Sequence, residues 1–432
     1  MPIPTRRFAS LVALAAIVLV VVGNGTVFLV VNTALVAVAL VDALLAQGAS
    51  VRVDRELPEV LALGATATVV WRVENVAGRG QTVALADELA PSLRPSTRRV
   101  RMRVRAHTTI EASATISPTR RGRFDIRAVS VRVDGPLGLA ARQRVVALPA
   151  VLRVYPPFRS RDEAELRINK ARILEVGLRS AQGRGGGTEF DQLREYSVDD
   201  EFRRIDWAAT ARTGRAIVRT YRAERNQTVV SLLDNGRVMA GRVDGVPRVE
   251  HAMDAVMMLT AVATRLGDRA GLVAFDQTVR AVVPPGHARD HLGRVTEAMY
   301  ELEPALAESD YRGAFTQTLA RFRRRTMLVV FTDLVEQAVG ESLLPALPLI
   351  SRNHVVVVAS VRDPEVVRWS AATPENAGEA YRRAAAVGAL EERRRTAARL
   401  RGMGATVVDD APGRMAPRLA DAYLRVKATG RL

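Results

Sequence analysis

The first 45 residues constrain the fold most, because they are almost uninterrupted apolar sequence. The tripeptide GNG at residues 23–25 divides this stretch into two runs, residues 8–22 and 26–45. One helix needs only about 20 apolar residues to cross a bilayer, so the stretch is long enough for two spans. It also exceeds the short apolar core of a signal peptide. We therefore predict two transmembrane helices within residues 1–47.

Arginines flank this apolar stretch on both sides. Arg6 and Arg7 precede it, and Arg52 and Arg55 follow it. Positive residues beside transmembrane segments stay in the cytoplasm, which predicts a helical hairpin with both ends inside. Everything after residue 50 is then cytoplasmic. The alternative is one long span with the body of the protein outside, and the matching arginines argue against it.

The composition narrows the possible partners. The chain has 432 residues, contains no Cys and carries a formal net charge of +17, so thiolate zinc sites and Cys nucleophiles are excluded. Such a charge suggests an anionic partner. However, Lys170 and Lys427 are the only lysines, and no block interleaves basic with aromatic residues as in nucleic-acid-binding surfaces. We expect a lipid bilayer as a partner and no nucleic acid.

Residues 48–156 have the pattern of an antiparallel β module. Segments such as ATVVWRV, QTVALAD and FDIRAVSVRV alternate apolar and polar residues with a period near two. Seven or so such segments occur, and turn sequences such as RRGRFDI and DGPLGL lie between or beside them. This spacing predicts an immunoglobulin-like β-sandwich.

Residues 228–432 change to a different periodicity. TVVSLLD, TMLVVFTD and HVVVVASV are strands that are apolar throughout, and they alternate with amphipathic helices. That pattern predicts a doubly wound α/β domain with a mostly parallel sheet. Sites in such folds lie at the carboxyl ends of strands, where Asp234 and Asp333 stand. The expected helices are 248–266, 287–302, 312–323, 341–351, 376–402 and 415–427.

The loop DNGRVM at residues 234–239 carries the strongest hint of a site. A phosphoryl-transfer nucleophile loop of the haloacid-dehalogenase type is rejected, because Gly236 stands where its second carboxylate belongs. A dinucleotide site is weak, because no G-x-G-x-x-G follows the strand. The adhesion-type metal site of von Willebrand factor A-like domains would use Asp234, Ser309 and Asp333 for Mg²⁺, a cation that prefers oxygen ligands.

That metal site is incomplete in this sequence. The two positions that should supply hydroxyls are Gly236 and Val238. We therefore expect no cofactor, with Mg²⁺ as the less favoured alternative. We also predict that Arg237 takes the place of the metal and pairs with Asp234 or Asp333.

Residues 157–227 lead into the α/β domain and contain a dense mixture of charged and aromatic residues. A structural ion-pair network is preferred for this segment, with a partner-contact surface next and catalysis last, because no His or nucleophile stands beside the carboxylates. The residues that carry the pattern are Glu189, Phe190, Leu193, Arg194, Tyr196, Asp200, Arg203, Ile205, Asp206, Trp207 and Arg212.

These residues form G-x-E-F-x-x-L-R-x-Y, then D-x-x-R-x-I-D-W and A-R, ahead of a strand that ends in Asp. The order resembles domain-of-unknown-function family fifty-eight over nearly the whole chain. The resemblance implies a bacterial protein with two N-terminal spans, a β domain and a von Willebrand factor A-like module. Asp199 stands where the family often has Gly, and Gly236 and Val238 stand where many members keep serines.

The resemblance also implies a role. Members of that family are typically encoded beside MoxR-type AAA ATPases and are thought to act with them in assembling or activating other proteins. We therefore expect a non-enzymatic, membrane-anchored adaptor at the bacterial inner membrane, with its soluble domains in the cytoplasm and an unknown client. The alternatives are a metal-dependent hydrolase that uses Asp234 and Asp333, and a structural cell-envelope protein.

Two weaker signals remain. His287 and His291 have the i, i+4 spacing of a zinc pair but lack a third ligand, so a solvated helix face is expected. EERRRTAARLRG at residues 391–402 likewise has the composition of a solvated helix.

Overall fold

The computed structural model describes most of the chain. The described residues are 2–22, 25–47, 51–181, 189–198, 200, 202–222, 227–335 and 339–429. They form two compact units, Met1–Tyr155 and Pro156–Leu432, each of which has its own hydrophobic core.

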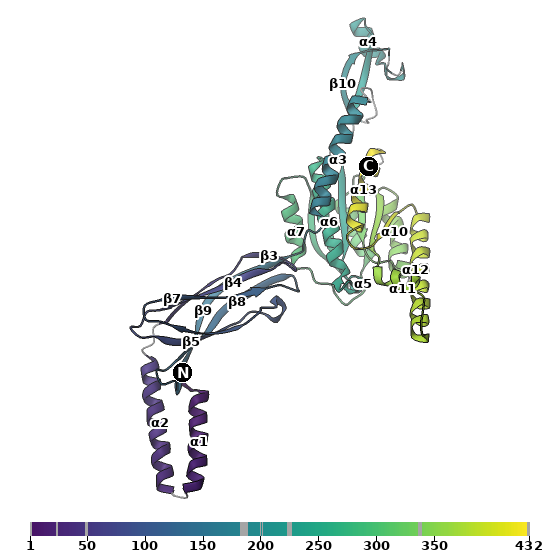
Figure 1. Ribbon diagram of the computed structural model, residues 1–432. Coiled ribbons are helices and arrows are strands. Elements are labelled where there is room, and N and C mark those ends of the chain that lie inside the picture. The colour runs from purple at the N-terminus through teal and green to yellow at the C-terminus, as the bar shows by residue number, and fades with distance from the viewer. Residues whose placement is uncertain are drawn as a thin grey trace. The chain divides into compact units, whose positions relative to one another are not determined.

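The first unit begins with two helices that run side by side (Figure 1). They are α1 (Arg6–Val22) and α2 (Gly25–Gln47). Among the described helices, only α2 is long and apolar enough to cross a membrane, over Gly25–Ala46. The structure therefore supports one candidate span by length and composition, whereas the sequence predicts two.

Both ends of this helical pair are tied to the β module of the same unit. Strand β1 (Pro2–Pro4) precedes α1 and pairs antiparallel with β9 (Ala140–Tyr155). Near the end of α2, the buried Asp42 carboxylate accepts backbone N–H bonds from Leu137 at 2.8 Å, Leu139 at 2.7 Å and Ala140 at 2.9 Å. The DGPLGL turn is therefore one place where the β module holds the α1–α2 pair.

The β module consists of two sheets that share one core. One sheet has the order β1-β9-β8-β5-β6, with β3 parallel to β9, and the other has the order β2-β4-β7. Alternate residues along most of β4 (Ala67–Asn75) and β5 (Gln81–Asp87) are buried, as the period-two pattern predicts. The remaining strands are β2 (Val51–Glu56), β3 (Val60–Ala62), β4 (Ala67–Asn75), β5 (Gln81–Asp87), β6 (Arg99–Val104), β7 (Thr109–Ile116) and β8 (Gly122–Asp134).

A buried polar group lies inside this sandwich. The Asp87 carboxylate pairs with Arg55 at 2.7 Å and accepts a hydrogen bond from the indole of Trp71 at 2.6 Å. The Arg55 side chain is only 1% exposed. One of the arginines used to predict membrane orientation is thus an internal residue of the folded module.

The second unit is built on a six-stranded sheet in the order β16-β15-β12-β17-β18-β19, parallel except for β16. Successive residues of each central strand enter two separate apolar clusters, one on each face of the sheet. This arrangement confirms the predicted α/β architecture with a mostly parallel sheet. The strands are β12 (Thr228–Asp234), β15 (Arg269–Phe275), β16 (Val279–Gly286), β17 (Met327–Phe331), β18 (Val355–Val361) and β19 (Thr406–Asp410).

Helices cover both faces of this sheet (Figure 1). On one face lie α3 (Arg161–Ala181), α6 (Arg248–Arg265), α7 (His291–Tyr300) and α13 (Met415–Ala428). On the other face lie α8 (Tyr311–Arg321), α10 (Leu344–Ser351) and α12 (Ala377–Gly402). The helices α3 and α11 (Pro364–Ala371) were not predicted from the sequence.

Candidate functional site

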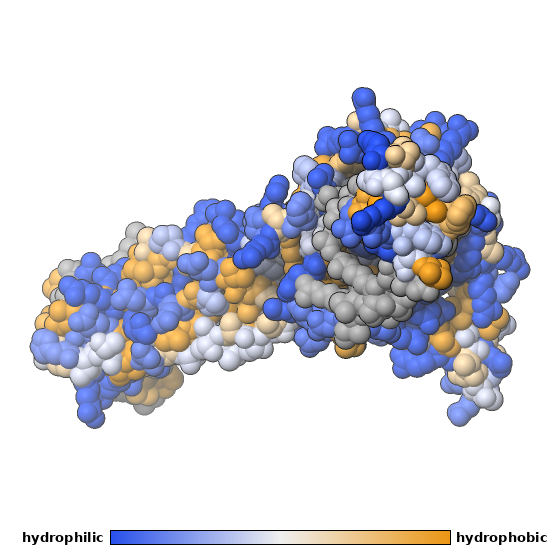
Figure 2. Space-filling view, turned by 90° about the horizontal axis from the view of Figure 1, so that it is seen from above, coloured by the Kyte–Doolittle hydropathy of each residue, from blue (hydrophilic) through white to orange (hydrophobic). Residues whose placement is uncertain are grey.

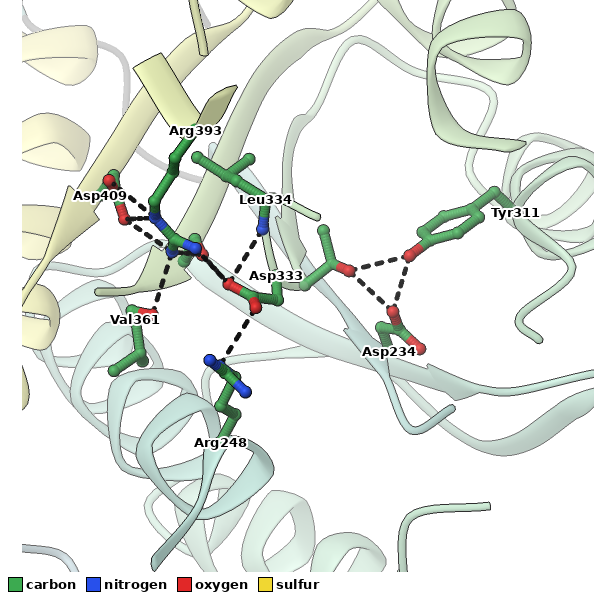
Figure 3. A network of polar contacts seen from close by, with 10 residues as sticks. Asp234, Arg248, Tyr311, Asp333, Leu334, Val361, Arg393 and Asp409 are labelled. Carbon is green, nitrogen blue, oxygen red and sulfur yellow. Dashed lines mark hydrogen bonds and ion pairs between the residues drawn. The ribbon is translucent and has the colours of Figure 1, made fainter. Parts of the chain in front are cut away.

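The candidate site lies where β12 and β17 end. These neighbouring strands are parallel, with Leu233 opposite Phe331, so Asp234 and Asp333 come to the same edge of the sheet. Figure 3 shows the two carboxylates on this edge, each with its own set of polar contacts. The sequence correctly places both side chains at strand ends.

Four donors surround the buried Asp234 carboxylate. Oδ1 accepts from the Gly236 N–H at 2.8 Å and from the Ser309 hydroxyl at 2.5 Å. Oδ2 accepts from the hydroxyls of Tyr311 and Thr332, each at 2.7 Å. Of these partners, only Ser309 was predicted as a site residue, so the two donors to Oδ2 were missed.

Burial governs the proton equilibria of this group. Removal from water raises the pKa of Asp234 from its usual value, although its hydrogen bonds to Ser309 and Tyr311 act in the opposite direction. Burial, together with the neighbouring Asp234 carboxylate, also raises the pKa of Tyr311 well above its ordinary value. Tyr311 is therefore a neutral donor at physiological pH.

The loop that follows Asp234 is held by backbone contacts with residues 303–309. The Asn235 side-chain amide donates to the carbonyl of Glu303 at 2.6 Å, and the Arg237 N–H donates to the carbonyl of Ala307 at 2.9 Å. At Gly236 a Cβ would overlap Ser309 Oγ and lie 2.9 Å from the Ala307 carbonyl oxygen. A serine at position 236 is sterically excluded in this conformation.

Asp333 lies between two arginines. Its Oδ1 pairs with Arg393 of α12 at 2.7 Å, and its Oδ2 pairs with Arg248 of α6 at 3.1 Å. Oδ1 also accepts from the Ser360 hydroxyl at 3.1 Å. Arg393 pairs in addition with Asp409 at 2.8 Å (Figure 3). Burial alone would lower the pKa of Arg393, but Asp333 and Asp409 reverse that effect and raise it.

The predicted role of Arg237 is wrong. Its guanidinium is exposed and pairs with Glu308, at the rim of the loop. The arginines that neutralise Asp333 come instead from α6 and α12, which are distant in sequence. A long helix rich in arginine was expected to be solvated, yet Arg393 is only 13% exposed.

The site fits a divalent cation poorly. The Asp234 oxygens already accept four hydrogen bonds, and Asp333 already has two cationic partners. A metal ion there would lie beside two guanidinium groups, which repel it. Within the described residues, no group of three or more His, Asp or Glu side chains has an arrangement suited to a metal.

We expect Asp234→Asn to fold and Asp234→Ala to lose about 3 kcal/mol of unfolding free energy. Alanine leaves several buried donors without an acceptor, at about 1–3 kcal/mol each before relaxation. Asparagine keeps an oxygen for Gly236 and Ser309, while the Tyr311 and Thr332 hydroxyls can rotate to accept from its NH₂ group. Native-state hydrogen exchange of the β12 amides measures the difference.

The same pair of variants has a pH signature. Because folding raises the pKa of Asp234, its stabilising contribution is complete below the unfolded pKa of about 3.9 and is lost as pH rises through the folded pKa. The neutral Asn variant lacks this loss. The unfolding free energy of wild type should therefore fall relative to that of Asp234→Asn as pH rises from 3.5 to 6. If the two proteins show the same pH dependence, folding does not raise the pKa of Asp234.

The family segment forms a separate two-stranded sheet. Its strands are β10 (Glu189–Glu195) and β11 (Ile217–Arg222), joined by η2 (Phe202–Arg204) and α4 (Trp207–Thr213). The backbones of Glu189 and Phe190 pair with Arg222 and Tyr221. The side chains of Glu189 and Phe190, and all of Asp199, lie outside the described part of the chain.

Several predicted motif residues hold this segment together. Arg194 pairs with Asp200 at 2.5 Å, and the Asp206 carboxylate pairs with Arg219 at 2.8 Å while it caps α4 through the N–H groups of residues 208 and 209. The hydrogen bond from Arg219 is the main reason that the pKa of Asp206 is lowered. Ile205 is buried and bridges to Val218.

Other motif residues have lesser roles in this framework. The N–H of Tyr196 donates to the carbonyl of residue 216 at 2.8 Å. Leu193 and Trp207 are 44% and 61% exposed, and the side chains of Arg203 and Arg212 are exposed as well. The motif thus contains both framework residues and surface residues.

The two histidines do not share a helix face. His291 is the first residue of α7, is buried, and its Nε2 lies 2.5 Å from the carbonyl oxygen of Ala270. His287 precedes the helix. The expected solvated face is wrong for His291, which is a buried packing residue.

Comparison with known proteins supports the family resemblance over the middle of the chain. Residues 192–369 match the model of a family described as "Protein of unknown function DUF58". Uncharacterized proteins of Mycobacterium tuberculosis and Mycobacterium bovis are 27% identical over 185 residues, which is 42% of this chain and 57% of theirs. The chain thus spans a little over half the length of these curated relatives.

Solved structures give only a weak likeness. The CARDB domain of a Pyrococcus furiosus protein, one structure of which is in complex with di-metal ions, has a TM-score of 0.18 and 12% identity and covers 24% of this chain and 94% or 88% of its own chain. A PapD-like domain of human CEP192 has the same score, identity and share of this chain, with 84% of its own. Scores this low support no inference.

Proposed function

We propose that this chain is a membrane-anchored, cytoplasmic adaptor that docks a MoxR-type AAA ATPase and has no catalysis of its own. In this proposal the α/β unit is a von Willebrand factor A-like module. The observation that carries the proposal is that both strand-end carboxylates already have partners within the protein. Asp234 is satisfied by four donors and Asp333 by Arg248 and Arg393, so neither is free to act as a base or a metal ligand.

The same observation argues against the hydrolase alternative. A metal-dependent hydrolase needs carboxylates that can bind the cation and activate water. Here two guanidinium groups lie beside Asp333, and that of Arg393 also donates to the Ser360 hydroxyl and the Val361 carbonyl. This arrangement favours an adaptor, which acts through its surfaces, over a hydrolase.

Membrane anchoring is supported by the N-terminal helices. α2 is long and apolar enough to cross a bilayer. β1 precedes α1 and pairs with β9, so both ends of the helical pair meet the same β module. If α2 crosses a bilayer, α1 must return through or into it. The arginines before α1 favour the bacterial cytoplasm for those ends.

The proposal is tested by capturing partners of the full-length protein from its native membrane after detergent solubilisation. We expect mass spectrometry to identify a AAA ATPase, and purified ATPase to bind the purified protein in a nucleotide-dependent way. Failure of purified ATPase to bind with ATP, with ADP or without nucleotide would overturn the proposal.

A further inference from the structure

The connection between β10 and β11 exposes three large apolar side chains. Val198 is 92% exposed, Phe202 is 67% exposed and Trp207 is 61% exposed. The rings of Phe202 and Trp207 contact each other edge to face, with centroids 5.6 Å apart. Single exposed apolar residues are common, but an exposed aromatic pair is a feature of interaction surfaces.

A rigid framework holds this aromatic pair in place. Phe202 opens η2 and Trp207 is the first residue of α4, and the Asp206 carboxylate caps α4 directly beside Trp207. The ion pairs Arg194–Asp200 and Asp206–Arg219 fix the backbone on either side. The aromatic rings therefore need little ordering when a partner binds, which lowers the entropic cost of association.

Two exposed arginines of this segment lie near the rings in sequence, one next to Phe202 and one on the helix that Trp207 begins. Three carboxylates whose side chains are described are paired with arginines: Glu195 with Arg215, Asp200 with Arg194, and Asp206 with Arg219. Arg203 and Arg212 are exposed, and no carboxylate among the described residues pairs with either of them. Figure 2, which views the molecule from the α4 end, shows apolar side chains interspersed with hydrophilic ones on this face.

We propose that Val198, Phe202, Arg203, Trp207 and Arg212 form a docking tip that inserts into an apolar, carboxylate-rimmed pocket on the ATPase. This inference rests on the proposed adaptor function and names the surface that performs it. Tryptophan and arginine contribute most of the binding energy at many protein interfaces, where a ring fills a pocket and a guanidinium pairs with carboxylates at its edge. The residues of this segment divide accordingly into a framework and a contact surface.

The test uses the full-length protein in nanodiscs of neutral lipid and the purified ATPase identified by capture. We expect Trp207→Ala and Phe202→Ala each to weaken binding about tenfold or more, the size expected for hot-spot residues. Arg203→Glu combined with Arg212→Glu should weaken it comparably, and the loss should shrink at high salt. Because these side chains are exposed, hydrogen exchange of β10 and β11 should stay unchanged.

Matched controls come from the same unit of the chain. Trp369 and Tyr381 are 36% and 78% exposed on α11 and α12, so their alanine variants remove exposed aromatics at another place. Arg394→Glu with Arg395→Glu reverses two other exposed arginines. These variants should bind the ATPase like wild type.

The outcomes separate the two proposals. If wild type binds the ATPase and the tip variants bind equally well, the docking tip is wrong and the adaptor function stands. If wild type does not bind, the adaptor function itself fails. If the tip variants lose affinity only for nanodiscs or vesicles with anionic lipid, the tip is a membrane contact and the proposed protein pocket is overturned.

Discussion

Asp333→Ala should lower the unfolding free energy of the α/β unit by about 3–5 kcal/mol, the usual loss when one partner of a buried ion pair is removed. Asp333 is 3% exposed on its side chain and is the carboxylate that Arg248 and Arg393 share. Without it, Arg393 keeps Asp409 as its carboxylate partner, and Arg248 loses the carboxylate with which it pairs among the described residues. Native-state hydrogen exchange of the β17 and β18 amides measures the change.

The control for this variant is Arg394→Ala, on the same helix as Arg393. Arg394 is 77% exposed and, among the described residues, pairs with Glu391 alone, at 3.5 Å, so its loss should change stability by less than about 1 kcal/mol. A combined Asp333→Ala, Arg393→Ala variant should be less damaging than the sum of the two single variants, because the pair is coupled. An Asp333→Ala protein as stable as the Arg394 control would show that the arginines do not depend on this carboxylate.

Gly236→Ser should destabilise the protein by about 1–3 kcal/mol and should not create a Mg²⁺ site. The substitution restores the residue type that adhesion-type metal loops carry, but its Cβ would overlap Ser309 Oγ and press on the Ala307 carbonyl. Both contacts belong to the segment that holds the loop after Asp234. Thermal unfolding and calorimetric titration with MgCl₂ measure the two effects.

Gly293→Ser is the matched control, because a Cβ at this glycine of α7 meets nothing within 4 Å. It should be neutral or slightly stabilising, since serine has the higher helix propensity. A Gly236→Ser protein that is as stable as wild type and binds Mg²⁺ would show that the loop can still adopt a metal-binding conformation. It would also reopen the hydrolase alternative.

The sequence predicts the sheet well, because the strands carry their own evidence. TVVSLLD and TMLVVFTD are apolar throughout, so their burial and the strand-end positions of Asp234 and Asp333 follow from the local pattern. The β module can be predicted equally well, because the alternation of apolar and polar residues in its sequence corresponds to alternating burial along β4 and β5. The domain limits and site residues inferred from the family resemblance stay predictions.

The partners of Asp234 and Asp333 could not be predicted in the same way, because they come from elements that are distant in the sequence. Asp333 meets Arg393, which is 60 residues further along the chain, and Asp234 meets Thr332, which is 98 residues away. The sequence did contain one indication that Arg393 is buried. That arginine lies three, four and seven residues before the buried Thr396, Ala397 and Leu400, which is the spacing of one helix face. The many neighbouring arginines made this buried helix face hard to recognise in the sequence.

The attachment of the N-terminal helices to the β module has a consequence for the order of events during synthesis. Pro2–Pro4 pair with Ala140–Arg142, and the Asp42 carboxylate needs the N–H groups of residues 137–140. The ribosome makes Asp42 95 residues before Leu137, the first N–H donor in that turn, so both helices exist before the turn that binds them. If the helices anchor the protein in a membrane, as we propose, their insertion precedes closure of the sandwich, and a chain stalled before residue 137 carries Asp42 still unpaired by that turn.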